Sequence, residues 1–248
     1  MEQNGSEAIT RTRLHKQVAR TLSLQILNGD ILPDSLLPNE DALSRQFGVS
    51  KPVVREAISF MDAKGLVRAR PRVGTRICTP DNWVLTDPVL LKWRIEAGPQ
   101  QALINDLLEL RAIIEPIAAG LAAKRATPEG LAKIARAMQA MSAGNSLEDH
   151  IAADIEFHRS IIEASGNELL ISTLRPVLEH TMGSSFQHFI TSVEAAKASV
   201  PFHQEVVTAI LHKDEPSAIA AMQKVIERSA NDIKKSMVST PVKLGEPH

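Results

Sequence analysis

A carboxylate and two imidazoles in the second half of the chain have the spacing of metal ligands. Asp154 and His158 are four residues apart, so on a helix they lie one turn apart on the same face. That face also carries isoleucines, and His203 heads a second apolar stripe further along the chain. Because a buried charge is costly unless it is paired or coordinated, the three side chains predict a divalent cation in an apolar interior. The alternative is an Asp154–His158 hydrogen bond with His203 as a core histidine.

Zinc is the default cation for such a set of nitrogen and oxygen ligands, and nickel or manganese also suit it. Arg111 stands on an otherwise apolar helical pattern in the same half of the chain. A guanidinium that faces a metal pocket can bind a carboxylate ligand through two hydrogen bonds. Its alternative partner is Glu115, four residues on. Phe189 and Ser199, which flank the loop before His203, are further candidates for the pocket.

A second group of candidates is basic and lies in the first 80 residues. Lys51 and Arg55 share the polar face of a short helical pattern, and Ser50 is a good N-cap for that helix. Arginine can contact guanine through two hydrogen bonds, and lysine provides a point charge that suits guanine or phosphate. This pattern predicts contacts to duplex DNA, with a solvated charged surface as the alternative. The other candidates for DNA contact are Arg72, Gly74 and Arg11.

Three short helical patterns and a β-hairpin surround the basic residues. The helices are expected within residues 14–27, 40–47 and 51–64, and the strands at residues 66–70 and 75–78. This order is typical of a winged helix-turn-helix, which we assign to residues 1–79. Residues 80–100 are expected to be a linker with one short helix from Pro88 to Glu96, and residues 239–248 a flexible tail.

The remainder, residues 101–238, is predicted to be an all-helical domain for effector binding, metal binding and dimerisation. No strand-like alternation interrupts the apolar helical spacing after residue 100. The fold class is therefore mainly α, with a helical bundle following the winged helix-turn-helix. The candidate helices span 100–124, 128–142, 147–165, 167–190, 194–212 and 215–237.

Composition and charge exclude several classes of protein. Hydrophobic residues make up 44% and charged residues 23% of the 248 positions, which is typical of a soluble globular chain. No apolar run is long enough to span a membrane, the polar N-terminus is no signal peptide, and the single cysteine, Cys78, fits a reducing cytoplasm. Residues 1–80 hold 12 basic and 8 acidic side chains against 16 and 21 in the rest, which favours a polyanion as the partner of the first module.

The turn, cap and recognition positions of the first module follow a specific order. Its elements are GDILP at 29–33, LPNE at 37–40, FGVSKPVVREAI at 47–58 and GLV at 65–67. Over residues 14–78 this order resembles the DNA-binding domain of GntR-family bacterial repressors. The resemblance implies binding to double-stranded, palindromic operator DNA as a homodimer. Family members often have arginine where this chain has Asp41 and Lys51, so its operator is expected to differ from that of the fatty-acid-responsive member.

The second module carries LLELRAIIEP at 107–116, DIEFHRSII at 154–162 and HQEVVTAI at 203–210. Over residues 101–235 these segments resemble the FCD-type effector domain of the FadR subfamily, in which one aspartate and three histidines hold a divalent metal. The resemblance assigns Asp154, His158 and His203 to that set and adds Asn167 as an effector-site candidate. The fourth ligand position falls on Val225, which cannot ligate. Water or effector then completes the coordination sphere, or the metal binds weakly or is absent.

The whole chain is similar to sugar-acid-responsive, galactonate-type repressors of this subfamily. The expected function is a cytoplasmic transcriptional regulator, not an enzyme, that a small carboxylate such as a sugar acid releases from its operator. One alternative is a metal-dependent hydrolase with a DNA-binding module, for which Glu156 or Glu115 would be the general base. Another is an architectural DNA-binding protein without a ligand.

Overall fold

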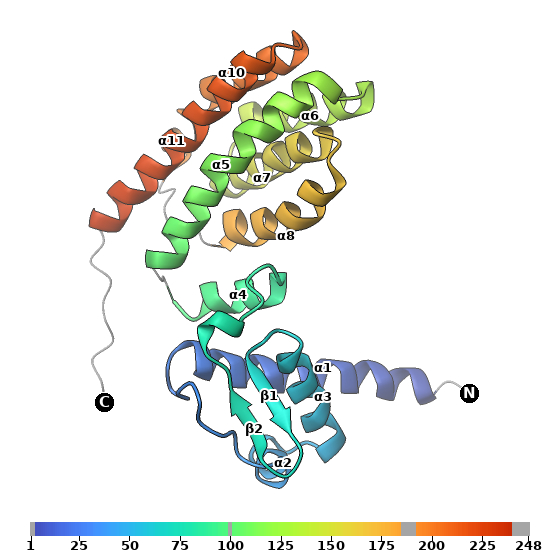
Figure 1. The fold of residues 1–248 in the computed structure, drawn as a ribbon. Coiled ribbons are helices and arrows are strands. Elements are labelled where there is room, and N and C mark those ends of the chain that lie inside the picture. The colour runs from blue at the N-terminus through green and yellow to red at the C-terminus, as the bar shows by residue number, and fades with distance from the viewer. Residues whose placement is uncertain (1–2, 99–100, 185–191, 240–248) are drawn as a thin grey trace. The chain divides into compact units, whose positions relative to one another are not determined.

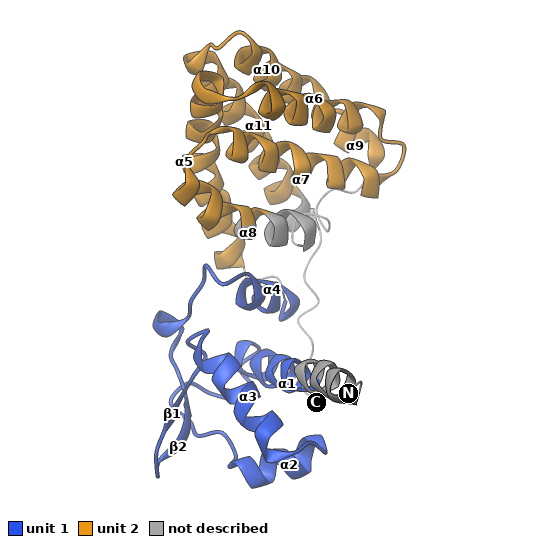
Figure 2. Ribbon diagram, turned by 90° about the vertical axis from the view of Figure 1, so that its right-hand side faces the viewer, with its two compact units in different colours: residues 1–98 blue, residues 99–248 orange. Residues whose placement is uncertain are grey.

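The chain divides into two compact units, Met1–Gly98 and Pro99–His248, which Figure 2 draws in different colours. The computed structural model describes residues 3–98, 101–184 and 192–239. None of the helices in these ranges is long and apolar enough to cross a membrane.

The first unit is a winged helix-turn-helix, as predicted (Figure 1). Fully buried apolar side chains from its helices and both strands form one core, with Leu22, Leu43, Met61 and Ile77 each at most 1% exposed. The two strands are antiparallel and pair Val67 with Ile77. The elements are α1 (Gln3–Leu27), α2 (Glu40–Phe47), α3 (Lys51–Asp62), β1 (Val67–Arg70) and β2 (Gly74–Ile77).

Local sequence sets the ends of the two central helices. The Asn39 side chain caps α2 by accepting a hydrogen bond from the backbone N–H of Ala42, which satisfies one of the helix's unpaired donors. Gly48 ends α2 at a φ of 63°, a left-handed conformation that glycine adopts without strain. Ser50 stands at the N-cap of α3, but its hydroxyl makes no capping hydrogen bond. That hydroxyl lies beside the exposed first turn of α3.

The segment that the sequence assigns to a linker packs on the first unit. It forms a 3-10 turn, η1 (Pro80–Asn82), and α4 (Pro88–Glu96), whose Leu90 and Trp93 belong to the same apolar cluster as Leu22. Asp87 caps α4 and also accepts a 2.8 Å hydrogen bond from the Nζ of Lys64, a side chain that is only 6% exposed. Because a buried ammonium needs a partner, this bond fastens the segment to the first unit, and the unit boundary lies after Gly98.

The second unit is all-helical over its described residues, as predicted. Helix α5 packs on α11, α6 on α7, and α10 on α11, around an apolar core that includes Phe157, Ile161, Met141, Val206 and Met222. The helices are α5 (Gln101–Arg125), α6 (Pro128–Ala143), α7 (Leu147–Ala164), α8 (Glu168–Ser184), α9 (Val193–Lys197), α10 (Val200–Leu211) and α11 (Glu215–Ser239).

One predicted helix of the second unit is interrupted in the structure. Residues 194–212 were expected to form a single helix, but they form α9 and α10 with a break at Ala198 and Ser199. The cause is Pro201, which stands in the first turn of α10. Proline has no N–H to donate to the carbonyl four residues earlier, and its ring clashes with that carbonyl. The break matters because it positions Ser199 one turn before His203.

Candidate metal centre and DNA-contact surface

The structure brings the three predicted metal ligands together inside the helical unit. Asp154 and His158 come from α7 and His203 from α10, and one ligand atom of each lies within 4.8 Å of the others. The Oδ1 of Asp154 is 3.1 Å from the Nε2 of His203 and 3.7 Å from the Nε2 of His158. Both imidazole side chains are at most 4% exposed. The cluster is therefore a buried, polar site within an apolar bundle.

A second set of contacts orients the two imidazole rings. The Nδ1 of His158 lies 2.5 Å from the Oε2 of Glu115, and the Nδ1 of His203 lies 2.9 Å from the backbone carbonyl oxygen of Ser199. Because these partners are acceptors, they favour the tautomer with the proton on Nδ1 in both rings. Each Nε2 then presents a lone pair toward the Asp154 carboxylate. The two Nε2 atoms and the Asp154 carboxylate are then three acceptors that face one another, an arrangement that a cation would stabilise.

The two histidine–aspartate distances fit a tetrahedral metal. With metal–ligand bonds of about 2.0–2.1 Å, two ligand atoms of a tetrahedral zinc lie about 3.3 Å apart, between the 3.1 Å and 3.7 Å of the two histidine–aspartate contacts. Metal-bound histidines commonly donate their other ring N–H to a carboxylate or a carbonyl, as Glu115 and Ser199 provide here. Val225, at the fourth family position, is 4% exposed in the apolar core. Among the described residues, this site thus offers three candidate ligands.

Buried charges extend the cluster into a continuous chain of contacts. The Nε of Arg111 lies 2.5 Å from the Oε1 of Glu115, and both side chains are at most 4% exposed. Burial by itself raises the pKa of Glu115, but the charges and hydrogen bonds of Arg111 and His158 lower it to about 2. Burial opposes ionisation of Asp154 as well, yet its contact with His203 and the neighbouring positive charges hold its pKa well below the ordinary value. Both carboxylates are ionised at neutral pH.

Two features of this centre were missed by the sequence analysis. Glu115 was expected only as a partner of Arg111 or a general base, but its second oxygen orients His158. Phe157 packs edge-on against both histidine rings, with centroid distances of 5.5 Å and 5.0 Å. The four-residue spacing of Arg111 and Glu115 was visible in the sequence. No sequence pattern, however, indicates which side chain of another helix a buried carboxylate will contact.

The remaining effector-site candidates have other contacts. Asn167 accepts a hydrogen bond from the backbone N–H of Leu170 at the start of α8, and the Ser199 hydroxyl donates to the backbone carbonyl of Ala196. Ser199 therefore contacts the centre through its carbonyl oxygen. Phe189 lies outside the described residues.

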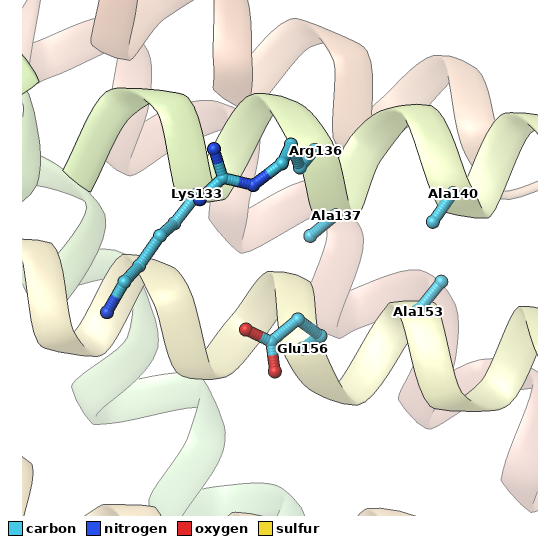
Figure 3. Close-up of a pocket in the computed structure, with 6 residues that line it drawn as sticks. All are labelled: Lys133, Arg136, Ala137, Ala140, Ala153 and Glu156. Atoms are coloured by element: carbon cyan, nitrogen blue, oxygen red, sulfur yellow. The ribbon is translucent and has the colours of Figure 1, made fainter. Parts of the chain in front are cut away.

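The carboxylates considered as a general base are placed elsewhere or already paired. Glu156 lines a groove between α6 and α7 together with Ala153 and Arg136 (Figure 3), and Arg159 contacts it at 2.5 Å. Glu115 is engaged by Arg111 and His158. Among the described residues these contacts leave neither candidate carboxylate to activate a metal-bound water, so the hydrolase alternative is not supported.

The basic candidates of the first unit lie on its exposed surface. On α3, the Nζ of Lys51 is 2.5 Å from the Oδ1 of Asp41, and the Nε of Arg55 is 2.7 Å from the Oε2 of Glu40. Both carboxylates come from the first turn of α2, where the helix dipole favours them. The sequence analysis did not predict these ion pairs.

The turn between β1 and β2 exposes further basic side chains. Arg72 is exposed there in a left-handed conformation with a φ of 63°, and Gly74 follows with a φ of 105°. Arg76 donates a hydrogen bond to the backbone carbonyl of Asp34. Arg11 lies in α1, but its side chain is outside the described part of the chain.

Comparison with known proteins identifies both units. The family model described as bacterial regulatory proteins, gntR family, matches residues 14–77, and the FCD domain model matches residues 106–228. The chain is 34% identical over 229 residues to the uncharacterized HTH-type transcriptional regulator YieP of Escherichia coli K12, covering 91% of this chain and 98% of YieP. It is 31% identical over 228 residues to the galactonate operon transcriptional repressor of the same organism, covering 88% and 96%.

Solved structures show the same fold at lower identity. The Lar protein, which controls expression of the Listeria monocytogenes agr system, superposes with a TM-score of 0.62 at 20% identity and covers 89% of this chain and 96% of its own. McbR/YncC of E. coli gives a TM-score of 0.52 at 16% identity, covering 90% and 97%. At these identities the likeness concerns the fold alone.

Proposed function

This chain belongs to the FadR-like part of the GntR family of DNA-binding transcriptional regulators, and we propose that it is a metal-containing repressor that a small carboxylate releases from its operator. It is not an enzyme, because its domains and relatives are those of regulators. The proposal places it in the cytoplasm as a homodimer on a palindromic operator. A two-fold operator suits a dimer, since one recognition helix contacts too few base pairs to be selective.

In this proposal α3 is the recognition helix. Lys51 and Arg55 lie exposed on its first turns, the part of a recognition helix that meets base edges in the major groove. Ser50 offers a hydroxyl to phosphate because that hydroxyl caps no helix donor. The proposed backbone contacts of the wing and the N-terminal helix are Arg72, Gly74 and Arg11.

The helical unit is proposed to hold one divalent cation, zinc by default and nickel or manganese as alternatives. The observation that carries this proposal is the convergence of Asp154, His158 and His203 in a buried site. Glu115 and Ser199 hold both rings by Nδ1, which supports ligation through Nε2. A metal held by these three residues would act as a Lewis acid that binds oxygen ligands.

The effector is proposed to be a sugar acid or a related small hydroxycarboxylate. Three protein ligands leave at least one coordination position for a carboxylate or hydroxyl oxygen. Arg111 is linked to His158 through Glu115, and it remains a candidate for contact with the effector carboxylate. Phe189, Ser199 and Asn167 remain candidates for the rest of the pocket. The name of the galactonate operon repressor supports this chemical class.

A thermal-shift screen tests the proposal. Purified protein is heated with D-galactonate, other sugar acids and simple carboxylates, with zinc or with EDTA, because a ligand that binds the folded state raises its stability. We expect at least one hydroxycarboxylate to raise the melting temperature with zinc and not with EDTA. Stabilisation of equal size in EDTA would show that the metal takes no part in effector binding.

Arg111 is tested by conservative replacement. Arg111→Ala would leave Glu115 buried without its guanidinium, so Arg111→Lys, which keeps the charge and loses the planar fork, is the better variant. We expect the lysine variant to bind operator like the wild type and to need more effector for release. An unchanged response would make Arg111 only a structural partner of Glu115.

A further inference from the structure

Both cations on the first turns of α3 are held by neighbouring carboxylates of α2. Lys51 is paired with Asp41 and Arg55 with Glu40, at 2.5 Å and 2.7 Å. The side chains of Lys51 and Asp41 are 52% and 55% exposed, and those of Arg55 and Glu40 are 65% and 38% exposed. Exposed pairs of this kind contribute little to stability and exchange partners easily. They therefore matter more for what the cations can bind than for folding.

The two pairs constrain their cations differently. Glu40 contacts Arg55 through Nε, and a guanidinium has five donors in a fixed fork. That contact fixes the plane of the guanidinium and leaves its terminal nitrogens for the two acceptors of a guanine. Lys51 has a single charged nitrogen, and Asp41 contacts that nitrogen itself. The Asp41 contact therefore neutralises the charge that a phosphate would attract.

From this difference we infer that Asp41 is a selectivity residue, which holds Lys51 back from DNA phosphates and thereby suppresses sequence-independent binding. This inference rests on the proposed role of α3 as the recognition helix. Phosphate contacts supply nearly all of the affinity for non-specific DNA, whereas base contacts distinguish the operator. A carboxylate that competes for one phosphate-binding cation weakens binding to random DNA, which depends on phosphate contacts. The base contacts proposed for Arg55 are retained, because Glu40 contacts that side chain through Nε.

Asp41 also repels DNA directly. The hydrogen bond from Lys51 lowers the pKa of Asp41, so the carboxylate is charged at neutral pH. It lies in the first turn of α2, and the first helix of a helix-turn-helix crosses the DNA backbone. A fixed negative charge at that place repels DNA phosphates. It therefore disfavours complexes in which no base contact compensates for this repulsion.

The test measures the binding of full-length protein to a random-sequence duplex at a series of salt concentrations. Asp41→Asn is compared with Asp81→Asn, a control in η1 that adds the same charge change at an exposed residue of the same unit. We expect Asp41→Asn to tighten random-duplex binding on the order of fivefold at 0.1 M salt. We also expect it to steepen the slope of log affinity against log salt by about 0.9 for each DNA-binding domain. Equal slopes for the two variants would overturn the inference.

A double-mutant cycle shows whether the effect passes through Lys51. In a Lys51→Met background we expect Asp41→Asn to gain clearly less affinity than it does in the wild type, because only the direct repulsion by Asp41 is then removed. A full gain without Lys51 would contradict the restraint of Lys51. A wild-type protein whose duplex binding shows no salt dependence would instead overturn DNA binding by α3, so the two failures are distinguishable. Helical circular dichroism and the melting curve of each variant verify that it is folded.

Discussion

The charged surface of α3 and the buried centre of the helical unit use the same residue types in opposite surroundings. In the first unit, Arg55 and Glu40 form an ion pair that is 65% and 38% exposed. In the second, Arg111 and Glu115 form one that is at most 4% exposed. An exposed pair contributes about 0–1 kcal/mol, and solvent can replace either partner. A buried pair cannot lose one partner without leaving an uncompensated charge.

The difference teaches which charges are available for exchange. The α3 cations can leave their carboxylates for a polyanion, because water stabilises the released groups. The centre cannot rearrange in this way, since each of its groups already depends on the next through Glu115, His158 and Asp154. Such a site responds to the addition of a cation or an anion. Exposure therefore separates the charged surface of α3 from the candidate metal centre more clearly than residue type does.

The largest expected effect comes from removing the buried carboxylate. Glu115→Gln leaves Arg111 without its anion and is expected to lower the free energy of unfolding by about 3–5 kcal/mol. Glu40→Gln, the matched change in the exposed pair, is expected to cost less than about 1 kcal/mol. Urea unfolding in EDTA, followed by circular dichroism, measures both. Similar losses of unfolding free energy in the two variants would contradict the distinction between the buried and the exposed ion pair.

Acid should weaken the metal-free helical unit through the same carboxylate. The folded-state pKa of Glu115 is lowered to about 2 from 4.5, so its contribution is fully present above the unfolded value and is lost as the pH falls from about 4.5 toward 2. Urea midpoints of the EDTA-treated protein should therefore drop across this window. In Glu115→Gln the drop should be smaller, and an identical acid dependence in that variant would assign the loss to other groups.

How much of this was visible in the sequence differs between the two regions as well. The winged helix-turn-helix, the helical unit and the exact span of α4 followed from caps, turns and apolar periodicity. Asp154, His158 and His203 were found by spacing within one helix and by inward-facing stripes. The partners across elements could not be found, because Glu115 reaches His158 and Asp41 reaches Lys51 only through tertiary packing. Pro201 was a visible signal for the break before α10. The prediction followed the helical periodicity of the apolar residues instead.

A smaller effect is expected for the exposed cation that we propose to contact bases. Arg55→Ala should weaken operator binding by about 1–3 kcal/mol and relax the preference at one base pair, while the stability of the fold changes little because the side chain is exposed. Selection of bound sequences from a random duplex pool identifies the operator, and anisotropy titrations then compare operator with random DNA. Equal losses on both would assign Arg55 to phosphate contact.

The most direct measurement is calorimetric titration of zinc into EDTA-treated, desalted protein. We expect one zinc per chain for the wild type and for His212→Ala, a control on the exposed end of α10. For His203→Ala, which removes one of the three candidate ligands, we expect at least a tenfold loss of affinity. Wild-type protein that binds no zinc, nickel or manganese, or a His203→Ala variant that binds as tightly as the control, would contradict a metal centre at Asp154, His158 and His203.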